Sequence, residues 1–307
     1  MADLGLGKLF HIIHMGETLK PLDDWYDDFY APRRGMMDGG YSAMEKRDAS
    51  LVVIADAIIE PMAPSTTVEG WQTMPVGRFW QKFGSHWHSL AFYCDDTGPI
   101  WEQLKERNVR MVTDGGNPIA GRPTGEQTAT SHGSLFTHPK DTGTQLEFYP
   151  KVMANDPRYA PDWDPGWSAR QPAGIDRLAY ATLVVRDLDA MTGMYVDGLG
   201  GTLLDESTSE LTGTRNAYVL LGTDTIVELA TPVTGDSLAA AETAAFGDML
   251  HAVAWRVASL EAAQEYLAAK DIPVIGRDDH TLLADPEHTF GGALRFTTWD
   301  VPGDPRA

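Results

Sequence analysis

The chain of 307 residues contains a single cysteine, Cys94, which excludes an intrachain disulfide and a zinc site built from several cysteines. Basic residues are also scarce. Its 24 Lys and Arg are outnumbered by 44 Asp and Glu, and the formal net charge is −20. Nucleic acids and anionic membrane surfaces are bound through clustered Lys and Arg, so we expect neither as a partner.

Long apolar runs are missing as well. No segment approaches the roughly 20 apolar residues that span a bilayer, and the N-terminus does not resemble an export signal. We therefore expect a cytoplasmic protein whose partner is a small-molecule substrate. The 43% of hydrophobic residues can fill the cores of two domains of ordinary size.

An internal repeat organises the sequence. Residues 89–109 and 252–272 each predict an apolar strand, an acidic or serine cap and an amphipathic helix. Residues 11–31 and 180–201 begin in the same way, and each is followed by further strand-like segments. The chain is therefore predicted to contain four units of a strand, a helix and three strands.

The two halves are separated by residues 153–174, which are rich in Pro, Asp and Trp and show little periodicity. We interpret this segment as a linker. It divides the chain into a first domain of residues 1–152 and a second domain of residues 175–307.

Two histidine-bearing strands and one carboxylate in the first half indicate a metal site. The segment LFHIIHMGE contains His11, SHWHSLAFYCDD contains His88, and TQLEFYP contains Glu147 within an apolar strand. A carboxylate in such surroundings is costly to bury without a cation or strong hydrogen bonds. Two histidines and one carboxylate on separate strands of one small barrel would supply that cation with ligands.

The four units, with HPKDTGTQLEF at the end of the second and DLDAMTGMYVDGLG at the start of the third, resemble the vicinal oxygen chelate superfamily. This superfamily includes glyoxalase I, methylmalonyl-CoA epimerase, extradiol dioxygenases and bleomycin-resistance proteins. The resemblance covers nearly the whole chain. It implies an α+β fold of four βαβββ modules paired into two curved half-barrel domains, a divalent metal on an inner face, and a homodimer through edge strands.

The resemblance implies His11 as the first ligand and Glu147 as the last. Aligned with the superfamily, the position of the middle ligand is occupied by Ser89, one residue after His88. We expect a β-bulge near Ser89 to turn His88 inward, with His86 as the alternative ligand.

For the isomerases of this superfamily, the resemblance implies a fourth ligand, Glu or Gln, four residues before the proline that ends the first unit. Counting back from Pro61 reaches Ala57, which cannot bind a metal, and leaves Asp56, Glu60 or Glu45 as substitutes. Three ligands match the facial triad of non-haem iron oxygenases. Fe²⁺ is therefore favoured, with Zn²⁺, Mn²⁺, Co²⁺ and Ni²⁺ as alternatives.

The corresponding positions of the second half predict that its metal site is lost. Tyr180, Glu228, His251 and Arg295 stand at these positions. An Arg cannot ligate a cation, so we expect Arg295 to pair with Glu228 instead.

His132 and His138 flank the strand before Glu147 and are candidate catalytic acids or bases. The leading hypothesis is a metal-dependent extradiol-type ring-cleaving dioxygenase acting on a small oxygenated or aromatic substrate. One alternative is a glyoxalase- or epimerase-like lyase or isomerase that acts through a metal-bound enolate. The other is a metal-free ligand-binding or resistance protein.

Overall fold

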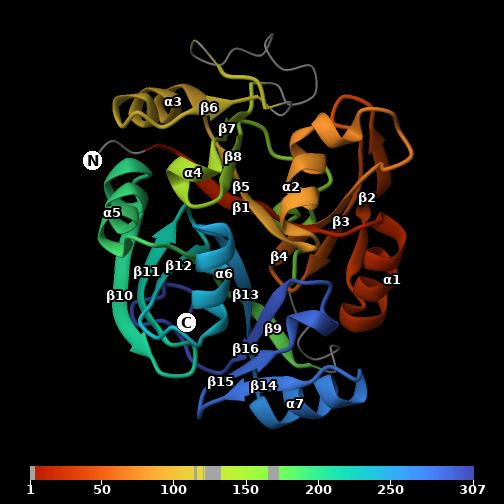
Figure 1. Cartoon of the computed structure of the whole chain (residues 1–307), viewed down its shortest axis with the longest axis vertical. Coiled ribbons are helices and arrows are strands. Elements are labelled where there is room, and N and C mark those ends of the chain that lie inside the picture. The colour runs from red at the N-terminus through yellow and green to blue at the C-terminus, as the bar shows by residue number, and fades with distance from the viewer. Residues whose placement is uncertain (1–3, 114–115, 120, 122–132, 165–172) are drawn as a thin grey trace.

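The computed structural model describes residues 4–113, 116–119, 121, 133–164 and 173–307. Its strands form two eight-stranded mixed sheets, one in each half of the chain (Figure 1). The first sheet has the order β2-β3-β4-β1-β5-β8-β7-β6, and the second repeats it as β10-β11-β12-β9-β13-β16-β15-β14. Each sheet pairs two modules through their opening strands, β1 with β5 and β9 with β13. The prediction of an α+β fold with four βαβββ modules is therefore confirmed.

The elements of the first half are β1 (Leu6–Met15), α1 (Leu19–Tyr30), β2 (Arg33–Ser42), β3 (Arg47–Ile54), β4 (Ala57–Pro64), α2 (Pro75–Phe83), β5 (His86–Cys94), α3 (Thr97–Glu106), β6 (Met111–Val112), β7 (Leu135–Thr137), α4 (Pro139–Thr142) and β8 (Gln145–Tyr149). Those of the second half are β9 (Ile175–Val184), α5 (Leu188–Gly193), β10 (Thr202–Ser209), β11 (Thr214–Leu221), β12 (Thr225–Pro232), α6 (Leu238–Phe246), β13 (Met249–Val257), α7 (Leu260–Ala269), β14 (Val274–Arg277), β15 (Thr281–Ala284) and β16 (Ala293–Thr297). Short helical turns lie at Trp71–Thr73, Pro157–Tyr159, Met194–Gly198 and Pro286–His288.

The helix starts follow the caps expected from the repeat. The Asp96 side chain accepts a hydrogen bond from the Gly98 amide at the start of α3. Ser259 does the same for the Ala262 amide at the start of α7. Each cap satisfies an amide that has no partner inside its own helix, which fixes where the helix begins.

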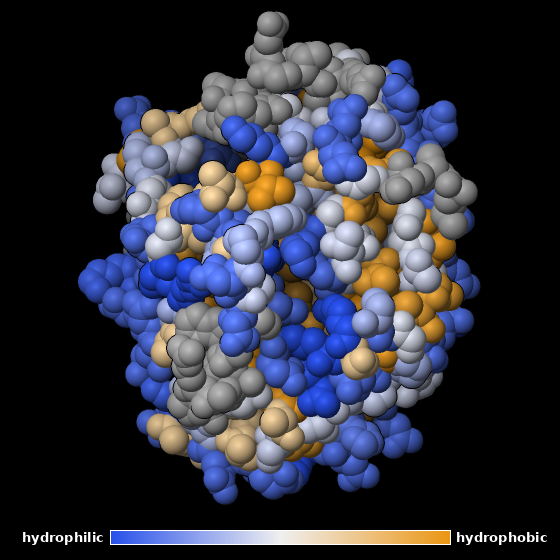
Figure 2. All heavy atoms as spheres, turned by 180° about the vertical axis from the view of Figure 1, so that it is seen from behind, coloured by the Kyte–Doolittle hydropathy of each residue, from blue (hydrophilic) through white to orange (hydrophobic). Residues whose placement is uncertain are grey.

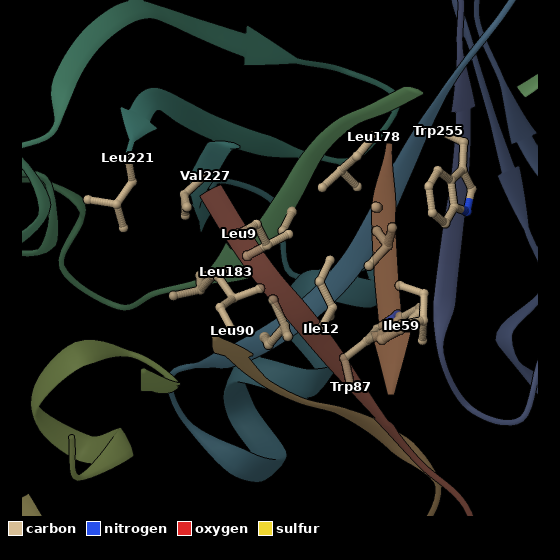
Figure 3. Packing of buried hydrophobic residues seen from close by; sticks show 14 of the residues in the cluster. Leu9, Ile12, Ile59, Trp87, Leu90, Leu178, Leu183, Leu221, Val227 and Trp255 are labelled. Carbon is tan, nitrogen blue, oxygen red and sulfur yellow. The ribbon is translucent and has the colours of Figure 1, made fainter. Parts of the chain in front are cut away.

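The two halves share one hydrophobic core. Buried residues of both opening strands, among them Leu9, Ile12, Leu178 and Leu183, meet between the sheets (Figure 3). Two tryptophan hydrogen bonds cross the junction: Trp87 Nε1 donates to the Ala293 carbonyl at 3.0 Å, and Trp255 Nε1 donates to the Tyr30 hydroxyl at 3.0 Å. The halves therefore do not pack as independent bodies.

Aspartates in equivalent turns also exchange contacts between the halves. Asp56, between β3 and β4, accepts a hydrogen bond of 2.7 Å from the Leu178 amide. Asp224, between β11 and β12, accepts one of 2.9 Å from the Leu9 amide. Each half thus satisfies a backbone donor on the opening strand of the other.

A short segment near the end of each half also occurs twice and binds the opening strand of that half. The sequence Asp-Pro-Arg occurs at residues 156–158 and again at 304–306. Arg158 pairs with Asp156 and donates to the carbonyls of Leu9 and Phe10 on β1. Arg306 pairs with Asp304 and donates to the carbonyls of Leu178 and Ala179 on β9. The part of the predicted linker that holds Arg158 is therefore tightly anchored to the first sheet.

The face turned away from the view of Figure 1 is mostly hydrophilic, with hydrophobic residues gathered at the right (Figure 2). Within the described ranges, no helix combines the length and the apolar character needed to cross a membrane.

Candidate functional site

The inner face of the first sheet encloses a cavity of about 570 Å³. The apolar part of its lining includes Phe10, Ile13, Leu51, Met62 and Phe136. Polar side chains line the rest. They come from the five strands β1, β3, β4, β5 and β8 and from the β2–β3 turn: His11, Glu45, Arg47, Glu60, His88, Gln145, Glu147 and Tyr149.

Two buried carboxylates lie beside the imidazole of His11. Its Nε2 atom is 3.0 Å from Glu60 Oε2 and 3.7 Å from Glu147 Oε2. All three side chains are at most 5% exposed. Neither ring nitrogen of His11 meets hydrogen-bond geometry with a partner in the described part of the chain. The imidazole is therefore directed toward anionic groups without a hydrogen bond that satisfies it.

Glu147 is held by three neutral donors. Ser89 Oγ donates to its Oε1 atom at 2.7 Å, Gln145 Nε2 to the same atom at 3.2 Å, and Tyr149 to Oε2 at 2.9 Å. Burial alone would raise the pKa of Glu147, but the His11 imidazole and the Ser89 hydroxyl outweigh burial and lower that pKa to about 2. Glu147 is therefore ionised at neutral pH.

The second carboxylate, Glu60, is held by a guanidinium. Arg47 Nη1 donates to Glu60 Oε1 at 3.1 Å, and Arg47 Nε donates to Glu45 Oε2 at 2.8 Å. Arg47 thus contacts two carboxylates, Glu45 and Glu60, and the third carboxylate, Glu147, lies beside His11 instead, with its Oε2 atom 3.7 Å from His11 Nε2. With neutral histidines and ionised carboxylates, the formal charge of Arg47 and these three residues is −2 in a largely buried space.

His88 reaches the same cavity through an irregularity of its strand. Between the pairs Ile12–Leu90 and His14–Trp87, β5 advances one residue more than β1. This bulge spans His88 and Ser89, as the sequence predicted, and places both side chains on the inner face. Burial lowers the pKa of His88 to about 4, and its buried Nδ1 atom has no hydrogen-bond partner among the described residues.

His86, the alternative ligand, lies elsewhere. Its Nδ1 atom is 3.1 Å from the Trp87 carbonyl, and its Nε2 atom is 3.4 Å from Glu242 of the second half. It is not among the residues that line the cavity. The bulge therefore separates the two histidines of this strand, with His88 in the cavity and His86 at the junction between the halves.

The count that led to Ala57 is wrong. It started from Pro61, but β4 continues to Pro64, and Glu60 lies four residues before that proline. Of the three substitutes, Glu60 is the one beside His11. Asp56 instead accepts the Leu178 amide at the junction, and Glu45 binds Arg47.

Of the two candidate acid–base histidines, the structure describes only His138. His138 is the N-cap of α4, where its ring accepts the Lys140 amide, and it does not line the cavity. Its pKa is lowered by partial burial and by Arg110. His132 lies outside the described residues.

The same positions of the second half form a closed ion pair, as predicted. Arg295 Nη1 lies 2.6 Å from Glu228 Oε2, and Glu228 Oε1 accepts a hydrogen bond of 2.7 Å from the Tyr218 hydroxyl. Both charged side chains are buried. This pair is neutral overall and has its partners within the protein. His251, which corresponds to His88, binds Glu242 at 2.6 Å.

As the side chains stand, no three or more His, Cys, Asp or Glu residues of the described ranges are arranged to hold a metal ion. Glu60 and Glu147 lie beside the His11 imidazole, and His88 faces the same cavity.

The sequence was compared with known proteins. The profile of the "Glyoxalase/Bleomycin resistance protein/Dioxygenase superfamily" matches residues 160–289. No curated protein sequence matches the chain. Among solved structures, a mutant of 4-hydroxymandelate synthase from Streptomyces coelicolor superposes with a TM-score of 0.62 at 10% identity, covering 95% of this chain and 92% of that one. Methylmalonyl-CoA epimerase from Mycobacterium tuberculosis matches with a TM-score of 0.38 at 22% identity, covering 40% of this chain and 87% of that one.

Residues 160–289 match the superfamily also known as vicinal oxygen chelate, and the chain as a whole shares the fold of 4-hydroxymandelate synthase.

The matched profile and the cavity fall in different halves of this chain. The profile covers most of the second half, in which Glu228 is paired with Arg295. The polar cluster lies in the first half. Sequence similarity to the superfamily is therefore recognised in the half that is predicted to have lost its site.

Sequence reasoning alone did not single out Arg47, Gln145 or Tyr149. One signal was available for Glu60, because it interrupts an otherwise apolar strand in AIIEPMAP. The contacts of Arg47 depend on its long side chain reaching from the start of β3 to Glu60 on β4, and no local pattern reveals that reach.

Proposed function

We propose that this protein is a metal-dependent vicinal oxygen chelate enzyme whose single site lies in the first half. The observation that supports this most is the formal charge of −2 around His11. Buried charges are normally paired, because an uncompensated charge in a low-dielectric space costs several kcal/mol. A divalent cation would offer the two positive charges that this cluster lacks.

The donors fit such a cation chemically. Two ligand atoms that lie about 2.1 Å from one ion at right angles are about 3 Å apart. The 3.0 Å and 3.7 Å separations of His11 Nε2 from the two carboxylates are close to that spacing. We assign His11, Glu60, Glu147 and His88 as the ligands. Binding requires the His88 ring and the carboxylates to turn toward one point.

The cation, when bound, would act as a Lewis acid toward two neighbouring substrate oxygens and stabilise negative charge that develops on them. The chain supplies the rest. Tyr149 stays protonated, because burial and Glu147 raise its pKa well above the ordinary range. Its hydroxyl can therefore donate a hydrogen bond but cannot accept a proton as a base. Phe10, Ile13 and Phe136 give the cavity an apolar lining that disfavours water.

The number of ligands decides between the two reaction classes. Four protein ligands would leave a bound cation room for the oxygens of one substrate. Three protein ligands would leave room for a co-substrate such as dioxygen as well. Because Glu60 lies beside His11, we favour a lyase or isomerase, and the ring-cleaving dioxygenase becomes the second candidate.

The experiment is a titration with Mn²⁺ or Co²⁺ of the wild type and of Glu60→Ala, Glu147→Ala and His11→Ala. Each substitution should weaken binding by about 100-fold or more if all three residues are ligands. Unchanged binding in Glu60→Ala would favour the dioxygenase, and oxygen uptake with catechol probes would then support it. Exchange of a carbon-bound proton in D₂O, with α-hydroxycarbonyl or dicarbonyl probes, would support the lyase or isomerase.

A further inference from the structure

Arg47 joins two of the three carboxylates of the cavity. It begins β3, and its side chain is 19% exposed. The Nε atom binds Glu45 and the Nη1 atom binds Glu60, so each carboxylate receives one hydrogen bond from a different edge of the guanidinium. Glu60 is nearly completely buried, whereas Glu45 lies further out at 18% exposure.

The contact on Glu60 is confined to one of its two oxygens. Arg47 binds Oε1, and Oε2 is the atom that lies 3.0 Å from His11 Nε2. A Glu side chain has a terminal torsion with broad preferences, so an unrestrained carboxylate would rotate in the cavity. The planar guanidinium removes that freedom more effectively than a flexible ammonium would.

We propose that the Glu45–Arg47 pair is a charge-neutral device that positions Glu60 toward His11. This inference depends on the proposed function, because Glu60 must be a metal ligand for its orientation to matter. Arg47 is thus a positioning residue that acts through Glu60. Glu45 has two effects: it fixes the guanidinium, and it cancels the positive charge that would otherwise repel a cation.

The cancellation matters because the two effects of Arg47 on metal binding have opposite signs. Removal of the guanidinium would remove its repulsion of a nearby cation, because like charges in a buried space interact strongly. Outer-sphere contacts that orient a ligand typically change metal affinity by about 10- to 100-fold. A single substitution of Arg47 would mix a gain from lost repulsion with a loss from lost orientation. A substitution that removes both charges isolates orientation.

The test is therefore the double variant Glu45→Gln/Arg47→Gln, which keeps the formal charge of the cluster at −2. We expect its Mn²⁺ affinity to fall by about 10- to 100-fold relative to the wild type, with the fold retained. The matched control is Glu228→Gln/Arg295→Gln, the same charge-neutral exchange in the second half, which should leave Mn²⁺ affinity unchanged. Circular dichroism and thermal unfolding of each variant show whether the protein measured is folded.

A conservative variant, Arg47→Lys, separates the positioning role of Arg47 from a purely structural role, because a purely structural role would not change the Mn²⁺ affinity. Arg47→Lys retains the charge but cannot bridge both carboxylates, so its affinity should lie between those of the wild type and the double variant. Wild-type affinity in the folded double variant would overturn the inference. Failure of the wild type itself to bind Mn²⁺, or equal binding by Glu147→Ala, would instead overturn the proposed function.

Discussion

Acidification should weaken the junction between the two halves through His14. This residue of β1 is fully buried, with Nδ1 2.7 Å from the Tyr26 hydroxyl and Nε2 3.1 Å from the Phe290 carbonyl of the second half. A carbonyl can only accept, so Nε2 holds the ring proton and Nδ1 accepts the Tyr26 hydroxyl proton. The folded protein therefore needs His14 in its neutral form.

The magnitude follows from the pKa. Burial lowers the pKa of His14 from 6.5 to about 3. Below pH 6.5 the unfolded chain binds a proton at His14 and the folded protein does not, until the pH approaches 3. The stabilisation is thus present above pH 6.5 and is lost as the pH falls toward 3. Between pH 7.5 and 5 the loss is about 2 kcal/mol in the free energy of unfolding.

The assay is urea unfolding of the wild type and of His14→Gln at both pH values. A Gln amide can still donate to the Phe290 carbonyl but does not titrate. Other groups, including Asp56 and Glu147, titrate in both proteins and cancel in the difference. We expect the stability difference between the two proteins to shrink by about 2 kcal/mol at pH 5. An identical pH dependence of the two proteins would refute the reasoning.

Three further predictions concern buried charges. Arg158→Ala should cost more stability than Arg306→Ala in urea unfolding, because the Arg158 side chain is 2% exposed and that of Arg306 is 14% exposed; equal losses would contradict this. Arg295→Met should destabilise by about 3–5 kcal/mol, because it leaves Glu228 buried and unpaired; an unchanged Tm would contradict the pairing. Burial raises the pKa of Asp56 to about 6, so its contribution to stability is lost as the pH rises from 3.8 through 6. Asp56→Asn should therefore raise the Tm at pH 8 more than at pH 4, and a pH-independent effect would count against it.

The fold was predictable from the sequence because its signals are local and repeated. Apolar strands, helix caps such as Asp96 and Ser259, and an ungapped match between the two halves recur at matching positions. Each cap or strand pattern depends on neighbours a few residues away, so a single sequence contains it. The bulge at His88 could also be predicted, because the position that corresponds to the superfamily's middle ligand is Ser89, one residue after His88.

The polar cluster was harder to predict from the sequence, because the residues that contact one another in it are distant along the chain. The sequence did not favour Glu60 over Asp56 or Glu45 because the end of β4 was placed at Pro61 rather than at Pro64, and strand ends are the least predictable feature of an element. Ser89 and Glu147 lie 58 residues apart, and the parallel register of β5 with β8 is what brings them together. The duplicated Asp-Pro-Arg segments were visible in the sequence, but only the structure connects them to the carbonyls of the opening strands.

The central claim is that the first half binds one divalent cation, and elemental analysis tests it most directly. The wild type, Glu147→Ala and the exposed control Glu102→Ala would be purified anaerobically without chelators and dialysed against the same metal mixture. The account predicts nearly one equivalent of metal in the wild type and in Glu102→Ala, and loss of that metal in folded Glu147→Ala. Full occupancy in Glu147→Ala, or no metal in the wild type after reconstitution, would contradict it.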